Sequence, residues 1–343
     1  MALIKKLIVT GAIVSVAAVA GFQWWASRPI TTEGPAIPFA IASGSGVGSA
    51  AQQMVSAGVP VNPFLFGMLA RVTGQAGRLK AGSYELDPST SPQRLLSKLV
   101  RGEFAQDSLT VIEGWTFRQM RQVVDAAPNL KHDTAKLSDQ ELLAKVTSDY
   151  KAPEGLFFPD TYLFAKGTSD LDVYKQAHEA MVKRLKAAWD KRETGLPYTE
   201  PYQALIMASL IEKETGKKNE RGMIAGVFVN RLRTGMLLQT DPTVIYGMGD
   251  KYQGKIRKKD LETDTPYNTY TRAGLPPTPI ALPGVESLAA ALAPARTEAL
   301  YFVSRGDGTS HFSENLDEHN RAVNQYQRGG NGAAGGAANG VPK

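Results

Sequence analysis

The chain has 343 residues, 43% of them hydrophobic and 21% charged, with a formal net charge of +6 and a pI near 9.2. This length and composition exclude a disordered protein and predict two or three domains. The absence of cysteine excludes a disulfide framework, a thiolate zinc site, a cysteine nucleophile and a lipidated N-terminal cysteine. The positive charge favours an acidic partner, which could be nucleic acid, anionic lipid or a cell-wall glycan bearing peptide carboxylates.

An apolar segment near the N-terminus predicts a membrane span. Lys5 and Lys6 precede an uncharged run, 7–25, that ends in a tryptophan pair. At about 1.5 Å per residue this run spans roughly 28 Å, close to the hydrocarbon thickness of a bilayer. The lysines would stay in the cytoplasm and the tryptophans would lie at the opposite interface. A signal peptide cleaved near Ala20 is the alternative, and either interpretation exports the rest of the chain.

The next part of the chain predicts a proline-punctuated linker over 29–38 and then a small α+β module. Helices are expected over 50–57 and 91–100, and a strand with alternating polarity over 79–86. Gly102 follows the second helix and is expected to end it.

The middle of the chain continues this mixture of strands and helices. We expect a strand over 109–112 and helices over 116–124, 133–150 and 172–191. The aromatic stretch 154–164 is interpreted as core packing, with a sugar-binding groove as the alternative. The histidines lack metal-ligand spacing, so we predict no metal site and no cofactor: His132, His178, His311 and His319.

A helix predicted over 202–215 carries two candidate acids, and Gly216 is expected to cap it. At about 100° per residue, Glu212 and Glu214 point about 200° apart and cannot work as a carboxylate pair. Glu214 lies over the more apolar side of the helix, where burial favours the protonated state that a general acid needs. A solvated carboxylate beside a lysine is the alternative for either residue.

A second helix is expected over 220–233, with Gly235 as its stop. After it the sequence is rich in hydroxyl, amide and tyrosine side chains among turn formers, which suits a carbohydrate site. The candidate glycan-binding residues are Asn230, Gln239, Asp241, Tyr267, Asn268 and Tyr270. For each of them a turn or capping hydrogen bond is the structural alternative.

Five motifs in order resemble the YceG-like family of endolytic murein transglycosylases. They are Glu154-Gly155 through Pro159-Asp160-Thr161-Tyr162, Ala208-Ser209 through Glu212-Lys213-Glu214-Thr215, Val227-Phe228-Val229-Asn230-Arg231-Leu232, Leu238-Gln239-Thr240-Asp241-Pro242-Thr243-Val244 and Tyr267-Asn268-Thr269-Tyr270. The resemblance covers nearly the whole chain and places the essential acid of the family on Glu214.

The resemblance implies an α+β fold in several parts. These are a cytoplasmic stub and transmembrane anchor (1–28), the linker (29–38), a LysM-like module (39–108) and a catalytic domain (109–327). The resemblance does not cover the tail (328–343), for which the Gly/Ala-rich composition predicts disorder. It also implies an inner-membrane protein with a cytoplasmic N-terminus and a periplasmic or extracytoplasmic catalytic domain. Peptidoglycan strands and the synthases of wall elongation are the implied partners, and nucleic acid is not.

The implied activity is a lytic cut of the MurNAc–GlcNAc bond that leaves a 1,6-anhydro-MurNAc end and needs one carboxyl group as acid and then base. A hydrolytic muramidase is one alternative; it needs a second carboxylate, for which Asp241 is the candidate. A wall-binding scaffold that works through the LysM-like module is the other.

Overall fold

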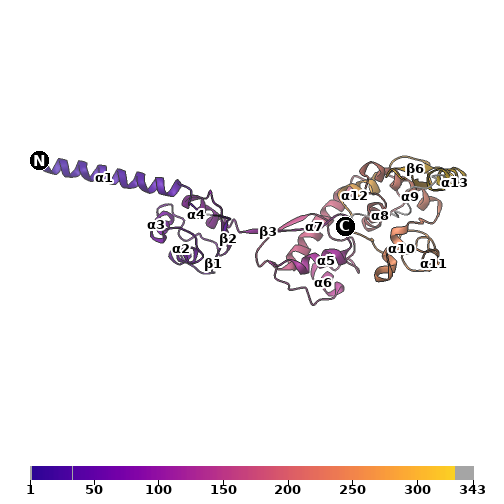
Figure 1. Cartoon of the computed structure of the whole chain (residues 1–343), viewed down its shortest axis with the longest axis horizontal. Helices are drawn as coiled ribbons and strands as arrows, with labels where there is room; N and C mark the ends of the chain where they lie inside the picture. The colour runs from indigo at the N-terminus through magenta and orange to yellow at the C-terminus, as the bar shows by residue number, and fades with distance from the viewer. Residues whose placement is uncertain (1, 33, 329–343) are drawn as a thin grey trace. The chain divides into compact units, whose positions relative to one another are not determined.

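The computed structural model describes residues 2–32 and 34–328, so the predicted tail beyond Arg328 lies outside the described residues. The chain divides into two compact units (Figure 1). The first comprises Met1–Asp107 with Leu163–Gly167, and the second comprises Ser108–Tyr162 with Thr168–Lys343. Each unit is mixed α+β, which confirms the predicted fold class. The finer domain boundaries and the LysM-like assignment stay predictions.

The first unit begins with a long apolar helix, α1 (Ala2–Ser27). Its Val9–Ser27 portion, 19 residues, is long and apolar enough to cross a bilayer by length and composition. The end of α1 is part of the globular fold, because Ala26 and Ile30 belong to the buried core of the first unit and Trp25 packs against it. Ile30 lies within the predicted linker, so the chain enters the core directly after the helix.

A two-stranded antiparallel sheet and three helices complete the first unit. Strand β1 (Ile37–Ile41) pairs with β2 (Gly82–Leu86), and Phe39 lies opposite Tyr84 with ring centroids 5.6 Å apart. The predicted helix over 91–100 is confirmed, since leucines of α4 are buried and Gly102 follows it in the left-handed conformation at φ 73°. The helices are α2 (Val47–Ser56), α3 (Pro63–Val72) and α4 (Pro92–Arg101).

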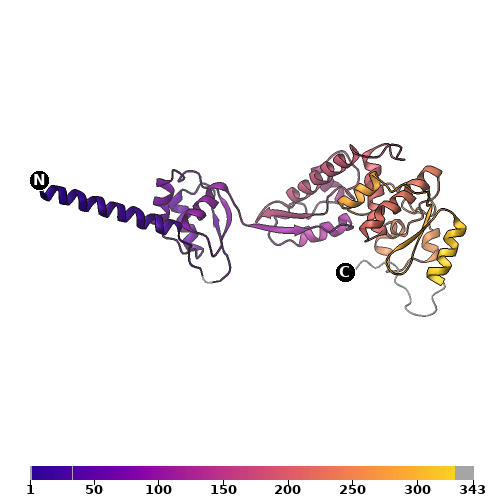
Figure 2. The same ribbon diagram turned by 90° about the horizontal axis from the view of Figure 1, so that it is seen from above.

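The second unit is mainly helical with short strand pairs (Figure 2). In this unit β5 (Tyr301–Ser304) pairs with β6 (Ser310–Ser313). The strands β3 (Gln106–Thr110) and β4 (Thr161–Ala165) pair with each other, and each of them has residues in both units. The helices are α5 (Phe117–Ala126), α6 (Asp139–Val146), α7 (Asp170–Trp189), α8 (Pro201–Glu214), α9 (Arg221–Thr234), α10 (Asp241–Met248), α11 (Lys258–Glu262), α12 (Val285–Leu292) and α13 (Leu316–Val323), with the short 3-10 helices η1 (Lys218–Glu220) and η2 (Gly249–Lys251) and the π-helix η3 (Asn324–Arg328).

The aromatic stretch 154–164 packs in the core of its surroundings. Phe157 is fully buried, Phe158 and Tyr162 are nearly so, and the Phe157 ring stacks on Phe117 with centroids 5.0 Å apart. The interpretation as core packing is therefore confirmed. Helix α6 is shorter than the predicted 133–150, because Ser138 and Glu141 form a reciprocal capping box that starts the helix at Asp139.

Candidate active site

Helix α8 delivers the candidate acid at its last residue. Pro201 begins the helix, where its missing N–H costs nothing, and residues 204–211 are all buried. The helix ends because Thr215 is extended, with φ −143°. Gly216 does not have a positive φ, so the predicted glycine cap is wrong. The extended Thr215 leaves the Glu214 side chain at the wall of a cavity.

Glu214 lies in a partly buried and electrostatically mixed environment. The Thr240 hydroxyl donates a hydrogen bond to Glu214 Oε1. Burial, with a smaller contribution from the nearby charge of Asp241, raises the pKa of Glu214 to about 7, while the Thr240 hydrogen bond and Arg231 oppose the rise. A carboxyl group with this pKa holds its proton in a substantial fraction of molecules at neutral pH and can donate it.

The segment that supplies Thr240 is held in an unusual conformation. Gln239 has φ 52°, the one positive value at a non-glycine residue in 2–32 and 34–328. Such strain persists only where the surroundings enforce it. Here the Gln239 N–H donates to the Thr269 carbonyl, and the Thr240 N–H donates to Thr269 Oγ1 at 3.0 Å. Directly afterwards Asp241 begins helix α10, so backbone constraints place Thr240 and Asp241 beside Glu214.

The cavity around Glu214 has a volume of about 1300 Å³ and walls of mixed polarity. Polar residues lie around the acid, and the hairpin β5–β6 and helix α13 contribute aromatic and aliphatic side chains. An apolar wall with scattered donors and acceptors fits a sugar, whose ring faces are apolar and whose rim is polar. The lining residues include Glu113, Trp115, Glu212, Lys213, Glu214, Arg231, Gln239, Asp241, Tyr270, Tyr301 and His319.

The structure brings together four of the residues that the sequence singled out. Glu214, Gln239, Asp241 and Tyr270 line the cavity, and the Tyr270 hydroxyl donates to Asp241 Oδ1 at 2.6 Å. Sequence reasoning did not single out Arg231, whose guanidinium donates to Gln239 and to the Leu237, Leu238 and Leu300 carbonyls. The sequence did offer one indication of its importance, because Arg231 lies within the third of the five family motifs.

The other three predicted residues do not line this cavity. Asn230 donates to the Thr297 and Ala299 carbonyls at 2.7 and 3.1 Å, which ties α9 to the chain before β5. The Tyr267 hydroxyl bonds to the Thr278 hydroxyl at 2.9 Å. Asn268 is 1% exposed and donates to three backbone carbonyls between 260 and 263. Their role in glycan binding stays a prediction.

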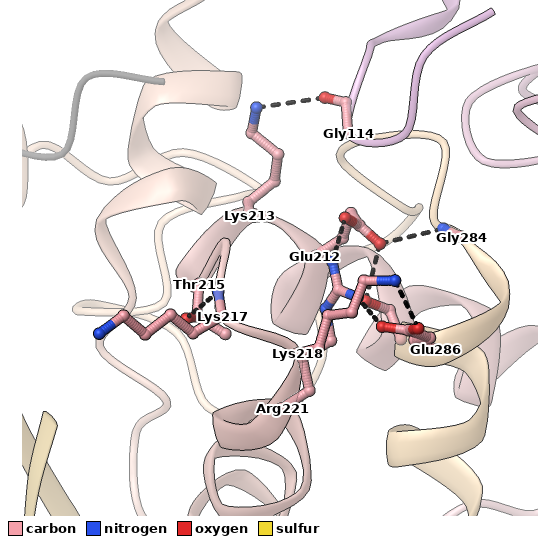
Figure 3. Close-up of polar contacts among 10 residues, drawn as sticks. Gly114, Glu212, Lys213, Thr215, Lys217, Lys218, Arg221, Gly284 and Glu286 are labelled. Carbon is pink, nitrogen blue, oxygen red and sulfur yellow. Dashed lines mark hydrogen bonds and ion pairs between the residues drawn. The ribbon is translucent and has the colours of Figure 1, made fainter. Parts of the chain in front are cut away.

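Glu212 also lines the cavity, but its carboxylate belongs to a polar network with residues of other segments (Figure 3). It accepts hydrogen bonds from Arg221 at 2.9 Å, from the Gly284 N–H at 3.0 Å and from the Ser287 hydroxyl at 2.7 Å. Arg221 also pairs with Glu286 at 2.8 Å. The side chains of Glu212 and Arg221 are only 5% and 7% exposed. Glu212 is thus a buried ion-pair partner that joins α8 to α9 and α12.

One carboxyl group with a raised pKa, that of Glu154, does not line the cavity. Glu154 is 5% exposed and accepts from the Phe117 N–H at 2.9 Å and the Tyr246 hydroxyl at 3.0 Å. Burial raises its pKa to about 7. Through these contacts Glu154 connects the start of α5 to α10. The motif that contains Glu154 did not predict these partners.

Among the described residues, one group could offer three metal ligands. Donor atoms of Asp125, His132 and Asp170 lie within 4.8 Å of one another. The carboxylate of Asp170 is already engaged in hydrogen bonds, because both of its oxygens accept from Thr134. None of these residues lines the cavity around Glu214.

Comparison with known proteins gives consistent matches over most of the chain. Residues 39–325 match the model of the YceG-like family. The chain is 35% identical over 306 residues to the endolytic murein transglycosylase of Bacillus subtilis (strain 168), covering 83% of each protein. It is 29% identical over 320 residues to the endolytic murein transglycosylase of Streptococcus pneumoniae serotype 2 (strain D39), of which it spans 57%. The crystal structure of a yceG-like protein from Listeria monocytogenes aligns with a TM-score of 0.54 and 33% identity, over 83% of this chain and 98% of that one.

Proposed function

The chain belongs to the YceG-like family, and from this premise we propose that it is a peptidoglycan lytic transglycosylase. The proposed reaction cuts the MurNAc–GlcNAc bond within glycan strands and leaves a 1,6-anhydro-MurNAc end. Two observations support it: relatives named endolytic murein transglycosylase match 83% of the chain, and a carboxyl group with a raised pKa lies in a cavity with sugar-compatible walls.

In the proposed mechanism Glu214 is the acid and then the base. Protonated Glu214 donates its proton to the glycosidic oxygen as the bond from that oxygen to the anomeric carbon of MurNAc breaks. The C6 hydroxyl of the same MurNAc then attacks the anomeric carbon, and its proton returns to the Glu214 carboxylate. The cycle consumes no water and restores the protonated acid. The single observation that carries this role is the burial that raises the pKa of Glu214 to about 7.

The neighbours of Glu214 have distinct proposed roles. Thr240 orients the carboxyl group through its hydrogen bond to Oε1. Asp241, held by Tyr270, raises the proton affinity of Glu214 by its negative charge. Gln239 and Tyr270 lie exposed or half-buried on the cavity wall, where they are positioned to hold glycan hydroxyl and acetamido groups.

The finer aspects of localisation are also proposals. We propose that α1 is a single-pass anchor with Lys5 and Lys6 on the cytoplasmic side, since its apolar portion has the length of a bilayer span. This orientation places the catalytic unit outside the cytoplasm, where peptidoglycan and its synthases lie. We keep the LysM-like module over 39–108 as part of the same proposal.

Product analysis tests the reaction type. Purified glycan strands digested by the enzyme are expected to give fragments that end in anhydro-MurNAc, because the C6 hydroxyl replaces water as the nucleophile. Mass spectrometry identifies these fragments, which are lighter by one water than the products of a muramidase treated in parallel. Reducing MurNAc ends would instead identify a hydrolase and would assign a water-activating role to a second carboxylate such as Asp241.

The pH dependence tests the proposed influence of Asp241. Because Glu214 must be protonated to start the reaction, activity is expected to fall as pH rises through about 7. Asp241→Asn removes a charge that raises the pKa of Glu214, so this fall should move to lower pH. The profile is obtained by measuring the initial rate of strand cleavage at each pH. Asp264→Asn, at an exposed ion pair with Arg272, should leave the profile in place, and an unchanged midpoint in Asp241→Asn would contradict the assignment.

A further inference from the structure

Helix α3 of the first unit is apolar on its exposed side as well as on its buried side. Its sequence, PFLFGMLARV, contains a single charged residue, Arg71. Phe66, Leu69 and Ala70 face the core and are at most 4% exposed, whereas Phe64 and Val72 are each 74% exposed. A helix that is hydrophobic all round is normally buried on all sides. The residues that the structure describes leave one side of α3 uncovered.

The apolar residues on the outer side of the helix, of which Met68 is half-buried and the other two are exposed, form a stripe along it. Phe64, Met68 and Val72 follow one another at intervals of four residues, which places them on one side of a helix within about 80° of one another. The helix has 10 residues, too few to cross a bilayer. A helix with this length and an apolar outer stripe suits the interfacial region of a membrane.

The position of α3 within the first unit matches a membrane surface. The C-terminal turns of α1 are built into the core of this unit through Ala26, with Phe22 and Trp25 packed against it. Figures 1 and 2 show α1 projecting from one end of the unit, and Figure 1 shows α3 at that same end. If α1 spans the bilayer, the end that carries α3 therefore faces the lipid headgroups.

The charges in the sequence around α3 are also compatible with binding to anionic lipid headgroups. Between Glu33 and Glu85 the chain contains no aspartate or glutamate and three basic residues, Arg71, Arg78 and Lys80. A segment with only positive charges is attracted to anionic headgroups and lacks the carboxylates that such a surface would repel.

We propose that α3 is an interfacial helix that docks the first unit onto an anionic phospholipid bilayer, with the stripe Phe64, Met68 and Val72 inserted beside the end of α1. The inference rests on the proposed role of α1 as the anchor. Two points of attachment, one spanning and one interfacial, fix how the first unit is oriented on the membrane, which a single helix does not do.

The absence of cysteine allows this to be tested in the full chain. Four single-cysteine variants carry a nitroxide spin label: Phe64→Cys and Val72→Cys on the stripe, Val14→Cys on α1, and Gln106→Cys at an exposed position of β3. Each labelled protein is reconstituted into vesicles of phosphatidylethanolamine with a minority of phosphatidylglycerol. Electron paramagnetic resonance then measures the collision of each label with oxygen, which concentrates in lipid, and with a water-soluble nickel chelate.

Labels at Phe64 and Val72 are expected to collide with oxygen in preference to the nickel chelate, with a ratio several-fold higher than that of the label at Gln106. The label at Val14 should be fully lipid-exposed. If Val14 is in lipid while Phe64 and Val72 behave like Gln106, the interfacial role of α3 is wrong and the anchor stands. If Val14 itself is aqueous, the proposed anchor is wrong. Far-ultraviolet circular dichroism of each variant verifies that the fold is retained, as expected for exposed substitutions.

Discussion

Glu214→Gln is expected to lower the rate of glycan cleavage by a factor of about 10²–10⁴, because it removes the only group proposed to protonate the leaving oxygen. Glutamine keeps the size of the side chain and can still accept the Thr240 hydrogen bond, so the fold should be preserved. The measurement is the initial rate of anhydro-product formation from purified strands. Thermal unfolding of the same preparation verifies that the loss is chemical.

The matched control is Glu113→Gln, because Glu113 is another carboxylate on the wall of the same cavity. Burial and the neighbouring charge of Glu212 raise its pKa, so proton affinity alone does not separate it from Glu214. The position of the two glutamates does separate them, because Thr240 and Asp241 lie beside Glu214. Glu113→Gln should therefore retain most of the activity. Loss in Glu113→Gln with retention in Glu214→Gln would move the acid to Glu113, and full complementation of a deletion strain by Glu214→Gln would favour the scaffold alternative.

The bounds of α8, the helix that carries the acid, could be predicted closely from the sequence, but the way its C-terminus is capped could not. The pattern over 202–215 comes within one residue of α8 at each end, because a long apolar segment without proline or glycine leaves few alternatives. Its end is set by the extended Thr215, whose side chain accepts from the Lys217 N–H at 3.0 Å. A side-chain turn of this kind competes with a glycine cap, and composition does not distinguish them.

The polar segments after α9 show why binding residues are harder to predict than elements. The sequence after α9 is rich in turn formers, yet Asp241 begins α10 with a proline in its first turn. Asn230 and Asn268 stay predicted ligands for a glycan, and tertiary folding places backbone carbonyls within reach of both amides. The hydrogen-bond partners of a short polar side chain often come from residues distant in sequence, as Thr297 does for Asn230. A local sequence pattern therefore does not predict them.

The opposite faces of Glu212 and Glu214 were predictable from helical geometry alone. The identity of the partners was not, because Arg221, Gly284 and Ser287 come from three other segments. The resemblance to the family singled out Glu214, and the structure adds a physical reason for two glutamates so close in sequence to differ. Both line the cavity, but Glu212 is held in an ion pair with Arg221, whereas Glu214 has a neutral hydrogen-bond partner, Thr240.

Glu212→Ala is expected to destabilise the second unit by about 3–5 kcal/mol, since it leaves the buried Arg221 with a single carboxylate partner. It also removes the acceptor for the Gly284 N–H and the Ser287 hydroxyl, which join α12 to α8. Urea unfolding followed by tryptophan fluorescence measures the loss, because Trp115 and Trp189 lie in this unit.

The control for Glu212→Ala is Glu286→Ala, which removes the other carboxylate from the same arginine. The Glu286 side chain is 39% exposed, so solvent screening should make the loss of stability much smaller than that of Glu212→Ala. The double variant Glu212→Ala/Arg221→Ala should lose less stability than the sum of its single variants, because removing both partners leaves no unpaired buried charge. Strict additivity would mean that Glu212 acts only through its hydrogen bonds to α12, and the ion pair would then have no part in holding the end of α8 in place.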